Sequence, residues 1–174
     1  VISGAGFGLS KTGAGAVVLS TVETYTGSTT VSAGTLAPSA NNLLVNSAKP
    51  VVDGGTFDIA HFDPSLAGVQ LLSGAITSGT TGKVTSTTTY DLQSGTVSAI
   101  LTGAVGLNKA SGGTVTLTRA NTYTGTTAVN QGTLSVTVNN ALSDITSGTT
   151  VASGGTLDFQ NVAYTTLEPV TLNG

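Results

Sequence analysis

The sequence predicts an all-β fold in which the chain winds into a solenoid of parallel strands, with roughly 20 residues in each coil. Three observations lead to this prediction. The phrase TYTGSTTVSAGTL, which begins at Thr24, returns as TYTGTTAVNQGTL 98 residues later, at Thr122. Glycines recur in a shorter rhythm beneath this long repeat, and apolar residues alternate with small residues after each of them. We expect residues 1–174 to form a single solenoid segment.

The long repeat divides the chain into residues 6–103 and an incomplete second copy, residues 104–174. GLSKTGAGAVVLS, from Gly8, matches GLNKASGGTVTLT, from Gly106, at the same separation of 98 residues. A tandem of immunoglobulin-like β-sandwiches is the alternative that such a period allows. A sandwich cut short at Gly174 would lose core strands, whereas a solenoid can stop at any coil because each coil contacts only its neighbours. We therefore favour the solenoid.

Each coil is expected to contain a strand that starts at a glycine followed by Thr or Ala and then by a large apolar residue. The glycines of this rhythm are Gly15, Gly34, Gly55, Gly74, Gly95, Gly113, Gly132 and Gly155. Successive side chains of a strand point to opposite faces. The residues two positions after the glycines should therefore stack into a core: Val17, Leu36, Phe57, Ile76, Val97, Val115, Leu134 and Leu157. The Thr and Ala residues between them should face outward as a ladder.

The composition excludes several classes of function. Charged residues make up 7% of the chain, against about 25% in a typical soluble domain. The five basic residues are scattered, so they cannot form the stripe that neutralises nucleic-acid phosphates. The absence of Cys excludes disulfides and thiolate metal sites. No apolar run reaches the ~18 residues of a membrane-spanning helix, and we expect no cofactor.

One stretch in each copy resembles a known repeat. GLSKTGAGAVVLSTVETYTGSTTVSAGTL, from Gly8 to Leu36, is similar to the autotransporter-associated β-strand repeat, also called the passenger-associated transport repeat. The second copy, from Gly106 to Leu134, resembles it too and retains Asn121 where the first copy has Glu23. The resemblance implies a right-handed parallel β-helix in the exported passenger of a large bacterial surface protein, without that protein's membrane-embedded β-barrel.

The densest group of chemically active residues is DGGTFDIAHFD, with Asp53, Asp58, His61 and Asp63. Polysaccharide-cleaving β-helix enzymes use clustered carboxylates with Ca²⁺, Arg or Lys. Asp53 and Asp58 are five residues apart, which puts them on opposite faces of a regular strand. We therefore expect a solvated corner with an Asp-type turn and a lone His, and neither a catalytic nor a metal site. The basic residues are too dispersed to complete an active site: Lys11, Lys49, Lys83, Lys109 and Arg119.

The predicted function is structural. We expect an extracellular or cell-surface stalk or scaffold segment that serves adhesion, aggregation or biofilm formation. A self-assembling filament is a close second, because an uncharged Thr/Ser/Val surface lacks the charges that normally block β-edge pairing. A carbohydrate-active enzyme, a lectin-like module and an ice-binding Thr array compete less strongly with this prediction. Partners would be further copies of the chain, neighbouring segments or glycans. Tyr25 and Tyr123, at matched positions, should be structural.

Overall fold

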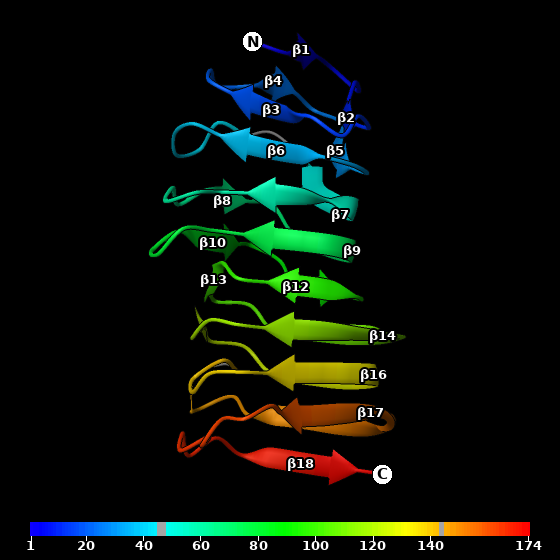
Figure 1. The fold of residues 1–174 in the computed structure, drawn as a ribbon, viewed down its shortest axis with the longest axis vertical. Helices are drawn as coiled ribbons and strands as arrows, with labels where there is room; N and C mark the ends of the chain where they lie inside the picture. Colours follow the sequence, from blue (N-terminus) through cyan, green and yellow to red (C-terminus); the bar gives the residue numbers. More distant parts are fainter. Residues whose placement is uncertain (45–47, 143–144) are drawn as a thin grey trace.

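The computed structural model describes residues 1–44, 48–142 and 145–174. Within these ranges the chain contains strands and turns but no helix, and hence no helix suited to crossing a membrane. The strands stack as rungs along one long axis, from the N-terminus at one end to the C-terminus at the other (Figure 1). Every strand pair recorded is parallel.

The prediction of an all-β solenoid is therefore confirmed. The immunoglobulin-like alternative is wrong, because such sandwiches are built from antiparallel strands. The right-handed winding implied by the family resemblance stays a prediction.

The described strands form three sheets. The largest contains β2 (Leu9–Lys11), β3 (Ala16–Leu19), β5 (Ser28–Val31), β6 (Thr35–Pro38), β7 (Ala48–Asp58), β9 (Gln70–Thr77), β11 (Tyr90–Leu92), β12 (Gly95–Val97), β14 (Leu107–Leu117), β16 (Thr127–Val136), β17 (Thr149–Phe159) and β18 (Val170–Asn173). The second contains β8 (Ser65–Leu66), β10 (Lys83–Ser86), β13 (Ile100–Gly103) and β15 (Thr122–Tyr123). The third pairs β1 (Ser3–Gly4) with β4 (Thr24–Tyr25).

The register follows the glycine rhythm through the first half of the chain. Thr35 pairs with Thr56, Thr56 with Ala75, and Ala75 with Thr96. The next step differs from the prediction, because Val97 pairs with Leu117 and not with Val115. Pairing with Val115 would have left a coil of only 18 residues beside coils of 19 to 21. A shift of two residues keeps every side chain on its predicted face, so the core pattern survives.

The predicted core column is buried along most of the rod. Its members Leu36, Phe57, Ile76, Val97, Val115 and Leu134 are at most 1% exposed. Val17 and Leu157 depart from the prediction: Val17 is 37% exposed, and Leu157 is only partly buried. Both lie near an end of the stack, where the described chain has fewer rungs to cover them. A core residue of a solenoid needs a neighbouring rung on each side.

Glycines allow the rungs to approach closely at one corner. Gly74 and Gly95 have φ values of 92° and 121°, a region that side chains other than Gly rarely adopt. A Cβ atom at Gly74 would lie 2.2 Å from the carbonyl oxygen of Gly55, and one at Gly95 would lie 2.2 Å from that of Gly74. The rhythm of glycines therefore reflects backbone stacked directly on backbone.

Replacement of Leu134 by Ala tests the continuous core. Leu134 is fully buried, so we expect the free energy of unfolding to fall by about 2–5 kcal/mol, measured by urea denaturation. Thr133→Ala, on the neighbouring half-buried position, is the matched control and should change stability by less than about 1 kcal/mol. Equal effects of the two substitutions would contradict an inward Leu134.

Candidate functional site: polar corners and a charged edge

The structure does not gather the four predicted polar residues of the first copy into one site. The Asp53 carboxylate accepts a hydrogen bond from Ser73 Oγ (3.2 Å). The Asp58 carboxylate accepts one from the backbone N–H of Ala60 (2.9 Å), which is the predicted Asp-type turn. Asp53 and Asp58 lie at different points of the 11-residue strand β7. Among the described residues, no group of three or more His, Asp or Glu could hold a metal ion.

Two buried lysines occupy equivalent corners in the two copies. Lys11 is 6% exposed and Lys109 is fully buried. Lys11 Nζ donates to the carbonyl oxygens of Gly13 and of Ala33 (2.9 Å), and Lys109 Nζ donates to those of Ser111 and Gln131 (2.9 Å). Each ammonium thus joins its own corner to the next rung. Burial lowers the pKa of Lys109, because desolvation disfavours the charged form.

The matched tyrosines are structural, as predicted. Tyr25 and Tyr123 are buried, at 1% and 0% exposure. Their hydroxyls share hydrogen bonds with Thr29 Oγ1 (2.5 Å) and Thr127 Oγ1 (2.7 Å), four residues further along in each copy. Burial raises the pKa of Tyr123 above its ordinary value, and burial does the same for Tyr90, whose hydroxyl lies 2.6 Å from the carbonyl oxygen of Val84.

Asn121 links three successive rungs. Its Oδ1 accepts a hydrogen bond from the N–H of Leu101 (2.8 Å) on one side, and its Nδ2 donates to the carbonyl oxygen of Ala141 (2.5 Å) on the other. Glu23, at the matching position of the first copy, accepts from the N–H of Ile2. A carboxylate has no N–H to donate in the other direction. With Glu23 in place of Asn, the first copy therefore lacks the side-chain hydrogen bond that Asn121 donates to the next rung.

A pair of asparagines in each copy has a structural role that was not predicted from the sequence. Asn42 and Asn140, which are 98 residues apart, both adopt positive φ, at 56° and 59°. Their preceding neighbours Asn41 and Asn139 accept hydrogen bonds from backbone N–H groups of the following rung, at 2.7 Å and 3.0 Å. The dipeptide Asn-Asn occurs in both copies and could have indicated a residue with positive φ, since Asn tolerates this conformation better than other side chains with a Cβ.

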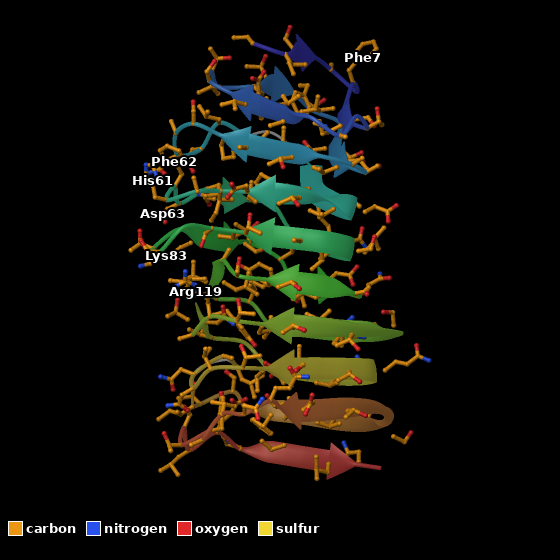
Figure 2. The ribbon with its side chains drawn as sticks, in the orientation of Figure 1. Phe7, His61, Phe62, Asp63, Lys83 and Arg119 are labelled. Atoms are coloured by element: carbon orange, nitrogen blue, oxygen red, sulfur yellow. The ribbon has the colours of Figure 1, made fainter. Side chains whose placement is uncertain are left out.

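Charged and aromatic side chains also gather at one edge of the rod, which we call the charged edge: His61, Phe62, Asp63, Lys83 and Arg119. Figure 2 shows these five residues above one another along one side of the rod. His61, Asp63 and Lys83 are exposed, and Phe62 and Arg119 are half-buried. The His61 and Phe62 rings lie 4.2 Å apart. No enclosed pocket forms among the described residues, so this edge is an open surface.

The ends of the stack expose apolar side chains. Near the N-terminal end, Phe7 is 71% exposed and Val17, a member of the core column, is 37% exposed. Near the C-terminal end, Leu167 is 89% exposed and Leu172 is 73% exposed. Figure 2 shows Phe7 beside the first rungs. Each end of the described stack therefore presents a surface that a further rung could bury.

Substitution Asn121→Asp tests the link between rungs. The change preserves shape but replaces the donor that faces Ala141 with an acceptor at a position only 7% exposed. We expect a loss of about 1–3 kcal/mol in the free energy of unfolding at pH 7, measured by urea denaturation. Glu23→Asn is the converse control and should not destabilise. An Asn121→Asp protein as stable as the parent would show that the amide contributes no link.

Alkaline unfolding tests the buried tyrosines. Folded Tyr90 and Tyr123 keep their protons above pH 10, where unfolded tyrosine ionises. Each should therefore reduce stability by about 1.4 kcal/mol per pH unit above that point. Lys109, whose pKa is lowered, acts in the opposite sense, but only up to its ordinary value of 10.5. Stability measured between pH 10.5 and 11.5 should fall steeply, and Tyr123→Phe should make that fall shallower; an unchanged slope would refute the assignment.

Comparison with known protein families and proteins finds the same repeat in this chain. Residues 9–37 and 107–136 match the family model of the passenger-associated transport repeat. The chain is 37% identical over 117 residues to the Adhesin BmaC autotransporter of Brucella suis biovar 1 (strain 1330). That alignment covers 59% of this chain and 3% of the adhesin, so the chain spans a small part of its relative's length. No solved structure matches. The predicted resemblance is thus confirmed: this chain is a β-solenoid in which two segments match the passenger-associated transport repeat, and it is similar over part of its length to an autotransporter adhesin.

Proposed function

We propose that this chain is a stalk or scaffold segment of a bacterial surface adhesin, held at the cell surface and serving adhesion, aggregation or biofilm formation. The observation that carries the proposal is the core column, which runs unbroken from Leu36 to Leu134 through the stacked rungs. Its passenger repeats support a cell-surface or secreted location. The adhesive role is drawn from the relative's name, and a stiff spacer is what such a core supplies.

The mechanism of a stalk is mechanical. Each rung buries its apolar side chains against the rungs on either side, so the stability of the rod is a sum of contacts between neighbours. The corner side chains add polar links in the same direction. Lys109 joins the corner at Ser111 to Gln131 on the next rung, and Asn121 joins Leu101 to Ala141. Both bonds lie in the direction along which the rod would be stretched or bent.

A catalytic role receives no support from the geometry. Glycoside hydrolysis needs two carboxyl groups that flank a bound sugar. The Asp58 and Asp63 carboxylates instead accept hydrogen bonds from the backbone N–H groups of Ala60 and Lys83, both at 2.9 Å. Two of the five basic residues, Lys11 and Lys109, are buried at corners. We therefore propose a non-enzymatic segment.

A self-assembling filament is the second candidate, and the apolar ends favour it. Phe7 at one end and Leu167 and Leu172 at the other are all more than half exposed. An end-to-end contact between copies would bury both surfaces and pair the open backbone edges of the two rungs. Such a head-to-tail contact does not close on itself, so it would extend into a filament.

Electron microscopy with sedimentation, over a range of protein concentrations, separates the two candidates. As a stalk segment, the chain should form uniform short rods of about 40 Å, at ~4.8 Å per rung, with an unchanged sedimentation coefficient. Long filaments that grow with concentration would overturn the stalk in favour of assembly. In that case Leu167→Ser should shorten the filaments, and Thr165→Ser, at an exposed position nearby, should leave them unchanged.

A further inference from the structure

The cationic side chains of this chain divide into three environments. Lys11 and Lys109 are buried corner links. Lys49 lies at the start of β7 and forms an ion pair with Asp91, with its Nζ 3.4 Å from Oδ2. Lys83 and Arg119 remain, and both belong to the charged edge, together with the single His of the chain. On a protein with 7% charged residues, this concentration distinguishes one side of the rod from the rest of its Thr- and Ser-rich surface.

The backbone brings the members of the charged edge together from distant parts of the sequence. The N–H of Gly79 donates to the carbonyl oxygen of Ala60 (2.5 Å), next to His61. The N–H of Lys83 donates to Asp63 Oδ1 (2.9 Å). These two bonds fix the corner of one rung against the corner of the next, so the His61–Phe62 pair and Lys83 occupy adjacent levels of the rod.

Arg119 reaches the same place from two rungs away. Its Nη2 donates to the carbonyl oxygen of Gly79 (2.8 Å), and its Nη1 lies 3.4 Å from that of Thr80. The coil between them turns through the short segment 98–99, which joins β12 to β13. A guanidinium carries five N–H donors, so these two contacts do not exhaust it.

The chemistry of the charged edge suits a ligand rich in hydroxyl groups. Lys83 and Arg119 supply donors, and the carboxylate of Asp63 supplies an acceptor within the same small area. Hydroxyl groups both donate and accept hydrogen bonds, so a hydroxyl-rich ligand can bond to the donors and to the acceptor at the same time. The neighbouring His61 and Phe62 rings, which are tilted by 39° to each other, add an apolar surface against which the C–H face of a sugar ring can lie. The Asp63 carboxylate offsets part of the charge of the two cations, so the edge is not built to hold an anion by charge alone.

We propose that the charged edge binds a neutral polysaccharide that lies along the rod. The open surface sets the size of the ligand: without an enclosing pocket among the described residues, one sugar would bury too little area, whereas a chain of sugars can contact several rungs at once. The stacked levels of His61, Lys83 and Arg119 supply such a row of contacts (Figure 2). The proposal does not rest on the stalk role, because a rod that binds no glycan remains a stalk.

Affinity electrophoresis of the whole chain in native gels tests the proposal. The probes are a neutral galactomannan, a neutral β-glucan and polygalacturonate, each at low and high salt. We expect retardation in at least one neutral gel at both salt concentrations. The double substitution Lys83→Ala with Arg119→Ala should weaken that binding at least tenfold. His61→Ala, which changes an exposed side chain, should weaken it several-fold, and it serves as the second variant if loss of Arg119 perturbs the fold.

The control is Lys49→Ala, which removes a partly exposed cation at the far end of β7 from the charged edge and should bind as the parent does. Thermal unfolding confirms that each variant folds. The proposal is overturned if no neutral gel retards the parent. It is also overturned if only polygalacturonate does so and salt abolishes the effect, which is simple ion exchange, or if Lys49→Ala loses as much binding as the double variant.

Discussion

The structure depends on one constraint: each coil must return to its starting point after about 20 residues so that its backbone pairs with the coil before it. Parallel pairing of Thr35 with Thr56 and of Thr56 with Ala75 shows this return. Side chains at equivalent points then stack in columns, which is why the sequence repeats at this interval. Where backbone lies directly on backbone, as at Gly74 over Gly55, a side chain has no room, and the same constraint selects glycine.

A stack of this kind leaves polar atoms at its corners, where the chain turns and the ladder of backbone bonds is interrupted. Lys109 and Asn121 meet this need with bonds to carbonyl and N–H groups of adjacent rungs. Among the described residues, no buried side-chain nitrogen or oxygen lacks a partner. This explains how a chain with so few charged residues still buries an ammonium group. The two stretches of this chain that match the passenger-associated transport repeat therefore contribute both apolar columns and the polar corners that connect them.

The rod also separates buried stacking positions from exposed ones. Inward columns and corners are fixed by the stacking, whereas the charged edge carries His61 and Arg119 in connecting segments and Lys83 at the start of β10. Loops on a rigid scaffold are the usual place for binding residues, since their side chains can change without disturbing the core. In this solenoid, the residues that hold the stack and the exposed residues of the charged edge are therefore different ones.

The sequence alone determined the fold class, the period and the inward column, because a two-residue alternation and a fixed coil length leave a direct record in residue order. It also predicted an Asp-type turn within DGGTFDIAHFD, and the bond from the Ala60 N–H places that turn at Asp58. Only the tertiary structure decided that Val97 pairs with Leu117, since a shift of two residues leaves the alternation unchanged. It alone brought Arg119 to Gly79, 40 residues away. Contacts across rungs depend on how far each corner projects, and residue order does not record that distance.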